Sequence, residues 1–352
     1  MNQNWSSTCQ LLLAFADPTF NIRTVANERD MYIDFVRTLD DAEFVRLARQ
    51  HRISALIGWR ATYQIPNLLP DSARVPLLQD LLINSRRNES LFSESARLLA
   101  SFAAIGARVL PRKGLVVATR YPTEGCRQLG DMDFLVPREH AKQVTGVAAA
   151  LGYKIGKVSG SSGDVRARSR HDLLFWQYFI RTEPMMFRRS DNPWLEHYAL
   201  DFRTDLLELN QPGRIDVSDV ISTATETGSF EHKGQWDLRY LALDVCVHAR
   251  RESDVIENAD SGRALILGRI IDALLIWRDQ RFDHDGFRAL VALTGCDDAV
   301  HWVVSHAKLF FPNAIPSNLD WAAGWSDEWE TYGVYEGRSH NWSSKTVERW
   351  FK

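Results

Sequence analysis

The segment GDMDFLVP, residues 130–137, constrains the fold more than any other stretch of the chain. Acidic and apolar side chains alternate in it, so Asp131 and Asp133 lie on one side of an extended strand and Met132 and Phe134 on the other. Two carboxylates this close repel each other unless a proton or a cation lies between them. We therefore expect a strand whose apolar side faces a core and whose acidic side faces a site.

Helical patterns surround this strand. The segment LLQDLLINSRRNESLFSESARLLASFAAIG, residues 77–106, has apolar residues at spacings of three and four, and Gly106 lies where such a helix would end. Four more helical patterns follow a Thr/Ser-rich connection at residues 218–229. We expect an α+β fold: a small mixed sheet with covering helices, flanked by helical domains. The expected domains are 1–106 (helical), 107–215 (the α/β core) and 216–352 (helical, with an irregular Trp-rich tail).

Within the core, short apolar runs and turn residues separate the expected elements. Helices are expected where LVVATRY (115–121) and REHAKQVTGVAAALGY (138–153) stand. Strands are expected in ARVLP (107–111), KIGKV (154–158), DLLFWQYFI (172–180), PMMFRR (184–189) and WLEHYALDFRTDL (194–206).

Composition excludes several classes of protein. With 45% hydrophobic and 25% charged residues in a chain of 352, wholesale disorder is not expected. A formal net charge of −3 gives no general attraction to nucleic acid or to an anionic membrane surface. The four cysteines are scattered, which argues against a zinc module and a disulfide scaffold. The first twenty residues lack a signal-peptide pattern and no run approaches 18 apolar residues, so we expect a cytoplasmic protein.

Three features together indicate a metal–phosphate site. Carboxylates spaced like Asp131 and Asp133 suit Mg²⁺ or Mn²⁺, although two solvated acids at a strand start give the same pattern. Lys113 and Gly114 stand where a strand meets a helix, a place for phosphate, although an ordinary turn with a solvated lysine looks the same. Asp201 is a third acid in an apolar strand and would complete a two-metal site, unless it lies on a solvated face.

The order of these motifs resembles the uncharacterised nucleotidyltransferase family of the DNA polymerase β-like superfamily. The resemblance covers most of the chain. It is carried by Lys113-Gly114, Tyr121, Arg127, the strand Asp131-Met132-Asp133-Phe134-Leu135-Val136, the helix end Leu151-Gly152-Tyr153, Asp201, His248 and Asp272.

The resemblance implies transfer of a nucleoside monophosphate from a nucleoside triphosphate and release of pyrophosphate. It leaves the base open, and we expect ATP as the donor only because ATP is abundant. It implies that Asp131 and Asp133 hold Mg²⁺ (or Mn²⁺) on the triphosphate, while Asp201 completes the second metal site and activates the acceptor. Lys113 and the Gly114 backbone would bind the β- or γ-phosphate. Arg127 is a second candidate for phosphate, because a guanidinium grips two oxygens at once, although a surface arginine is the plain alternative.

Two positions depart from the wider pattern. Lys-Gly stands where the superfamily has Gly-Ser, which is usual for the subfamily. Arg203 stands where the family has a histidine after the third acid, and we count it among the candidate nucleotide-binding residues. If that position contacts substrate, the acceptor or its geometry differs. Because Asp201 is retained, we expect an active enzyme.

Other residues carry weaker signals. His171 and His248 could face the cleft, but a lone histidine is more often structural. A basic Gly/Ser-rich loop with Arg166, Arg168 and Arg170 could clamp a triphosphate or be solvated. The tryptophans of the C-terminal half could stack on a base, but helical spacing favours core positions; they are Trp236, Trp277, Trp302, Trp321, Trp325 and Trp329.

Two rival functions remain open at this point. A glycosyltransferase also uses a D-x-D pair, but its first hundred residues would form a doubly wound nucleotide domain, whereas here they are helical. A non-catalytic nucleotide-binding or antitoxin-like interaction protein would keep the fold without turnover. Among acceptors we favour a small molecule, with a protein acceptor as a further option. Nucleic acid and membrane partners are not expected.

Overall fold

A computed structural model of the chain describes residues 5–27, 29–159, 163–175, 184–207, 213–226, 236–255 and 264–324. It also describes residues 258, 326, 329, 332–335, 338–341 and 349–351. All structural statements below concern these residues.

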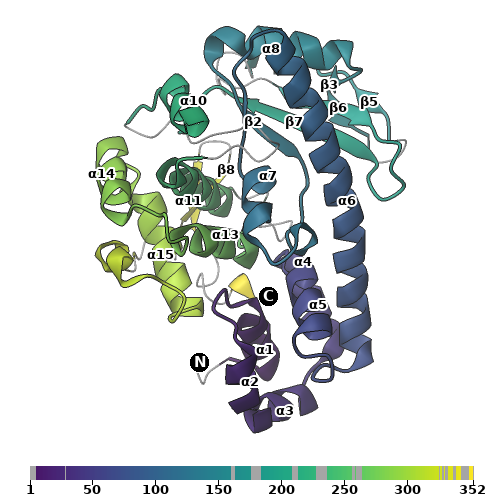
Figure 1. The fold of residues 1–352 in the computed structure, drawn as a ribbon, viewed down its shortest axis with the longest axis vertical. Helices are drawn as coiled ribbons and strands as arrows, with labels where there is room; N and C mark the ends of the chain where they lie inside the picture. The colour runs from purple at the N-terminus through teal and green to yellow at the C-terminus, as the bar shows by residue number, and fades with distance from the viewer. Residues whose placement is uncertain are drawn as a thin grey trace.

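A five-stranded mixed sheet carries the acidic strand (Figure 1). Its order is β1-β2-β7-β6-β3, with only the β2–β7 pair parallel. The strands are β1 (Leu110–Pro111), β2 (Met132–Leu135), β7 (His197–Arg203), β6 (Met186–Arg189) and β3 (Lys154–Ile155). This confirms the expected α+β class, and a sheet with one parallel pair does not match the doubly wound domain of the rival glycosyltransferase.

Helices α6 (Asp71–Ala104) and α8 (Arg138–Ala150) cover one face of this sheet. Met132 and Phe134 are fully buried there, as the alternation predicts. Phe102 of α6 contacts Phe134 and Phe202 with ring centroids 6.1 and 5.8 Å away. The opposite face of β2 and β7 is therefore the one that presents the acids.

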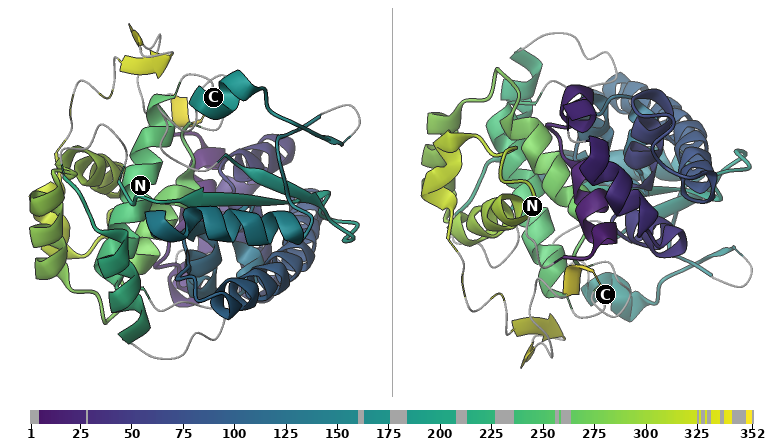
Figure 2. Two further views of the ribbon diagram at one scale, coloured as in Figure 1. Left: turned by 90° about the horizontal axis from the view of Figure 1, so that it is seen from above. Right: turned by 90° about the horizontal axis from the view of Figure 1, so that it is seen from below.

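The rest of the N-terminal segment is helical, as expected. It contains α1 (Ser7–Ala16), α2 (Ile22–Asn27), α3 (Arg29–Arg37), α4 (Asp41–Gln50) and α5 (Ser54–Tyr63). Figure 2 shows these helices between α6 and the C-terminal helices, and one apolar cluster includes buried side chains from all three regions. The three-part division of the chain stays a prediction.

The C-terminal helices are α10 (Val217–Glu226), α11 (Leu238–Asp254), α13 (Leu267–Trp277), α14 (His284–Thr294) and α15 (Asp297–Phe310), followed by the 3₁₀ turn η4 (Ser317–Ala322). The expected connection at 218–229 is wrong over its first part, because α10 occupies it; Val220 and Ile221 are buried on the core. The irregular tail contains a hairpin of β8 (Tyr332–Tyr335) and β9 (Arg338–Asn341).

A second correction concerns the strand expected at 172–180. Residues 170–175 form the short helix α9 (Arg170–Phe175), and residues 176–180 lie outside the described residues. The segment KIGKV divides into β3 and β4 (Lys157–Val158), and β4 pairs with β5 (Val165–Arg166) in a separate two-stranded sheet. The remaining core helix is α7 (Gly114–Val117), extended by the 3₁₀ turn η1 (Ala118–Arg120).

Buried ion pairs join the core to the C-terminal helices. Arg112, next to β1, donates to both carboxylate oxygens of Asp244 in α11, and both side chains are at most 5% exposed. Arg120 donates to Asp279 just after α13 at 2.6 Å. These contacts hold α11 and α13 across from the acidic face of the sheet.

The two extremes of the described chain meet in the large apolar cluster. Trp350 is fully buried, with its ring centroid 4.9 Å from Phe310 and 5.8 Å from His51. Trp5 lies 5.7 Å from Phe351 between ring centroids. Among the described residues, no helix is both long and apolar enough to cross a membrane.

Candidate active site

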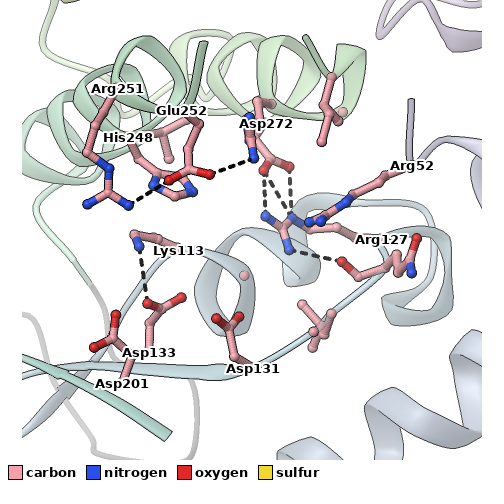
Figure 3. A pocket seen from close by; sticks show the side chains of 18 of the residues that line it. Arg52, Lys113, Arg127, Asp131, Asp133, Asp201, His248, Arg251, Glu252 and Asp272 are labelled. Atoms are coloured by element: carbon pink, nitrogen blue, oxygen red, sulfur yellow. Dashed lines mark hydrogen bonds and ion pairs between the residues drawn. The ribbon is translucent and has the colours of Figure 1, made fainter. Parts of the chain in front are cut away.

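A cavity of about 370 Å³ lies between the acidic face of the sheet and helices α11 and α13. The seven residues predicted to bind the metal or the nucleotide all line it: Lys113, Gly114, Arg127, Asp131, Asp133, Asp201 and Arg203. In Figure 3 the three acids lie on one side of the cavity, His248, Glu252 and Asp272 lie on the other, and Lys113 lies between. Residues distant in sequence thus form one site.

The acids are placed by the pairing of two strands. Asp133 on β2 is the direct register partner of Asp201 on β7, because these strands run parallel in the middle of the sheet. Asp131 immediately precedes β2 and lines the same cavity, as the period of two requires. Asp133 and Asp201 are 6% and 7% exposed.

Lys113 reaches the acids from a strained backbone. Its φ of 44° and ψ of −115° lie where glycine is favoured, and it is one of two non-glycine residues with positive φ in the described chain. The turn redirects the chain from β1 into α7 and aims the ammonium at Asp133, with 3.1 Å between Nζ and Oδ1. Strain of this kind gathers at functional sites because the surrounding structure has to enforce it.

Gly114 is required by the packing of Arg127. A Cβ at Gly114 would lie 2.6 Å from Nη1 of Arg127 and 2.8 Å from Cδ2 of Leu129. Arg127 lies flat against this glycine and donates to Asp272 through Nε (2.9 Å to Oδ1) and Nη2 (2.7 Å to Oδ2). The hydroxyl of Tyr121 donates to the same carboxylate at 2.8 Å. The predicted phosphate ligand Arg127 is therefore held by an acid of α13 at the cavity edge.

Helix α6 fixes the loop that carries Arg127. Asn88 donates from Nδ2 to the carbonyls of Glu124 and Arg127 at 2.6 and 2.7 Å. A Cβ at Gly125 would lie 2.0 Å from Oγ of Ser85, so only glycine allows this close approach.

Arg203 faces the third acid. Its Nε donates to Oδ2 of Asp201 at 3.0 Å, and both side chains are largely buried, 14% and 10% exposed. The other oxygen, Oδ1 of Asp201, is buried without a hydrogen-bond partner among the described residues. Arg203 is thus paired with the third acid inside the site.

The wall facing the acids includes charged residues that the sequence reasoning missed. They are Arg52 at the α4–α5 turn, Arg251 and Glu252 on α11, and Arg269 on α13. Glu252 accepts from Arg251 at 2.6 Å and from Arg269 at 3.4 Å. A helical signal was available for three of them: positions 251 and 252 follow His248 by three and four residues, and 269 precedes Asp272 by three.

Arg52 had no such signal. It comes from a turn between two N-terminal helices, with φ of 57°, and the turn is joined to the start of α13 by a hydrogen bond from Gly268 N to His51 O of 3.1 Å. The contact between this turn and the start of α13 brings Arg52 to the cavity.

Charge and burial shift the pKa values of the two neighbouring acids in opposite directions. The negative charge of Asp133, with burial, raises the pKa of Asp131 to about 7. Burial opposes the ionisation of Asp133, but Lys113 and Arg112, helped by Arg203, outweigh it and lower the pKa of that carboxyl. Burial, Lys113 and Arg269 depress the pKa of His248 well below its ordinary value, so its ring is neutral near pH 7.

The carboxylate oxygens that line the cavity are the type of ligand that a hard divalent cation prefers. Three carboxylates face one cavity, and Asp131 forms no ion pair or hydrogen bond within the described chain. Lys113 and Arg203 instead occupy one oxygen each of Asp133 and Asp201. In the described part of the chain, no three His, Cys, Asp or Glu side chains converge closely enough to hold one ion.

Of the residues with weaker sequence signals, only some line the cavity. His248 lines the cavity; His171, Arg166, Arg168 and Arg170 do not. Trp236, Trp277, Trp302 and Trp329 are buried and Trp321 is partly buried away from the cavity, while Trp325 lies outside the described residues. The prediction that these tryptophans occupy core positions is therefore confirmed for those that the structure describes.

Comparison with known proteins gives one match. The family described as uncharacterised nucleotidyltransferase matches residues 37–312, more than half of the chain. No curated protein and no solved structure matches. The matched range includes Arg52, the three acids and the facing wall of the cavity.

Proposed function

Because the chain belongs to the uncharacterised nucleotidyltransferase family, we propose that it transfers a nucleoside monophosphate from a nucleoside triphosphate to an acceptor and releases pyrophosphate. The observation that carries this proposal is the pairing of Asp133 with Asp201 across two parallel strands, beside Asp131 and opposite a wall that includes Arg52, Arg251 and Arg269, in one cavity. ATP is the proposed donor because it is the most abundant triphosphate.

The triphosphate would lie along Lys113 and the start of α7. The first N–H groups of a helix have no acceptor within the helix, and Lys113 and Gly114 both line the cavity at this point. Arg127, fixed by Asp272, and Arg52 add positive charge at the other end of the cavity. Fixed cations of this kind stabilise charge on the phosphoryl group as it is transferred.

Asp131 and Asp133 are the residues that would hold Mg²⁺ or Mn²⁺ on the triphosphate, next to the third acid, Asp201. When bound, such an ion neutralises phosphate oxygens and polarises the α-phosphoryl group. Asp201, with one oxygen unpartnered, would lie beside the attacking group of the acceptor. Lys113 would turn from Asp133 toward phosphate, since its ammonium sits on a flexible stem.

We assign the acceptor to small molecules. The cavity of about 370 Å³ falls within the range of roughly 300–1,000 Å³ that small-molecule sites occupy, so it would hold the triphosphate. For the acceptor, the formal net charge of −3 gives no general attraction to a nucleic acid. A protein acceptor is the alternative, and it would reveal itself when label from α-labelled ATP remains on a polypeptide rather than on a small product.

The test is calorimetric binding of each of the four nucleoside triphosphates with and without Mg²⁺. We compare wild type, Asp131→Asn/Asp133→Asn, and a charge-matched control, Asp191→Asn/Asp285→Asn, at two exposed positions. We expect Mg²⁺-dependent binding to be lost in the first variant and kept in the control. No triphosphate binding by well-folded wild type refutes the proposal, as does equal binding by both variants. Binding without pyrophosphate release in the presence of any acceptor supports the non-catalytic binding protein instead.

A further inference from the structure

Arg203 and Asp201 form a pair that the strand itself maintains. Residues two apart on a strand project to the same face, so β7 places the guanidinium on the same side of the sheet as the carboxylate. Their contact of 3.0 Å lies in the cavity wall, where both side chains are largely buried. The strand therefore places a positive charge next to the third acid.

The three acids consequently differ in what they can offer a metal. Asp131 forms no described ion pair, and the partner of Asp133 is a lysine on another element, whose flexible stem allows it to leave for a phosphate. The partner of Asp201 is a planar, always charged guanidinium fixed on the same strand. A divalent ion on Asp201 would lie next to this guanidinium and be repelled by it.

Oδ1 of Asp201 has a different use. It is buried, has no hydrogen-bond partner within the described chain, and belongs to a carboxylate that lines the cavity. Unpartnered buried acceptors are costly, so such an atom indicates a donor that arrives with a ligand. The hydroxyl of an acceptor is a donor of this kind.

We propose that Arg203 supplies the positive charge that a second metal ion would otherwise bring to Asp201, so that this chain binds one metal ion per nucleoside triphosphate, on Asp131 and Asp133. This inference rests on the proposed function. Asp201 then serves as the proton acceptor for the incoming hydroxyl, and Arg203 is a positioning residue that keeps Oδ2 occupied and Oδ1 directed to the acceptor.

The step balances without a further reagent. The O–H bond of the acceptor breaks, its oxygen forms a bond to the α-phosphorus, and the proton passes to Oδ1 of Asp201. The bond between the α-phosphorus and the oxygen that bridges it to the β-phosphorus breaks, and that electron pair leaves with pyrophosphate. The products are the nucleotidylated acceptor and pyrophosphate.

The experiment counts bound Mn²⁺ by electron paramagnetic resonance, with an ATP analogue whose α–β bridging oxygen is a methylene group. We expect one Mn²⁺ per bound analogue in wild type and in Arg203→Lys, which keeps the charge. Arg203→Gln should acquire a second Mn²⁺ with at least tenfold tighter affinity than wild type shows for it. The control is Arg166→Gln, at an exposed position outside the cavity.

Single-acid variants add a test that does not depend on Arg203 substitutions folding well. Asp131→Asn and Asp133→Asn should lose the Mn²⁺, whereas Asp201→Asn should keep one Mn²⁺ with unchanged affinity. Two Mn²⁺ of similar affinity in wild type, or loss of Mn²⁺ in Asp201→Asn, overturns the inference. Absence of analogue binding in every protein is a separate result, because it refutes the proposed function on which the inference stands.

Discussion

The pair between Arg127 and Asp272 offers the sharpest test of how this site is held together. Asp272, 5% exposed in α13, accepts from Nε and Nη2 of Arg127 and from the hydroxyl of Tyr121. The change Asp272→Ala removes every one of these acceptors and leaves the guanidinium and the phenol facing an apolar methyl group. We expect a large loss of stability rather than a local effect.

The magnitude follows from burial. Removing one partner of a buried ion pair costs about 3–5 kcal/mol, because the remaining charge stays away from water. The side chain of Arg127 is 19% exposed and borders the cavity, so water can compensate in part and the lower end, about 3 kcal/mol, applies. For a chain of 352 residues that unfolds cooperatively this corresponds to a fall in Tm of about 4 °C.

Thermal and urea unfolding followed by circular dichroism measure this loss. Asp191→Ala, at an exposed position, is the control and should unfold like wild type. The double variant Arg127→Met/Asp272→Leu should be more stable than Asp272→Ala, because it removes the stranded charge together with its partner. A loss below about 0.5 kcal/mol for Asp272→Ala, typical of exposed sites, or a double variant less stable than the single one, would refute the reasoning.

Two further changes test other features of the fold. Gly114→Ala places a Cβ against Arg127 and Leu129, so we expect Mg²⁺–ATP binding to weaken at least tenfold while Tm falls by only a few degrees; calorimetry with unchanged affinity would contradict the packing argument. Burial lowers the pKa of His306 to about 3, so the unfolded chain takes up a proton below pH 6.5 that the folded chain refuses, and stability falls as the pH drops. Between pH 7.5 and 5.5 wild type should lose about 1.4 kcal/mol more than His306→Gln in urea titrations, and equal losses would show that the ring is protonated in the folded state.

The core of the site was predictable because its signals are local. Alternation around Asp131 and Asp133 is a property of a single strand, and it correctly predicted the buried sides of Met132 and Phe134. The turn at Lys113-Gly114 follows from a short strand next to a short helix. Local patterns could therefore name the acids, the lysine and the glycine.

The facing wall was not predictable in the same way. Arg52 reaches the cavity through the contact between the α4–α5 turn and the start of α13, and no pattern near residue 52 shows this. The partners of Arg127 and Arg203 are fixed by tertiary structure, so the sequence could propose phosphate contacts but not the pairs with Asp272 and Asp201.

The errors in secondary structure have a related cause. The apolar run at 172–180 fits a strand or a buried helix equally well by periodicity, and its first part is helical. The segment at 218–229 is rich in Thr and Ser, which favour turns, but burial of Val220 and Ile221 on the core stabilises α10. Tertiary packing overrode local preference at α10, whereas at 172–180 the local pattern itself was ambiguous.

The contact between His51 and Trp350 also bears on how the chain folds during its synthesis. A ribosome makes the chain from the N-terminus, so α4 and α5 are released long before the indole that covers His51 exists. Until then the ring of His51 lacks this aromatic cover, although α4 and α5 can already pack on α6. The burial of His51 is therefore completed only after a segment about 300 residues further along the chain has been translated.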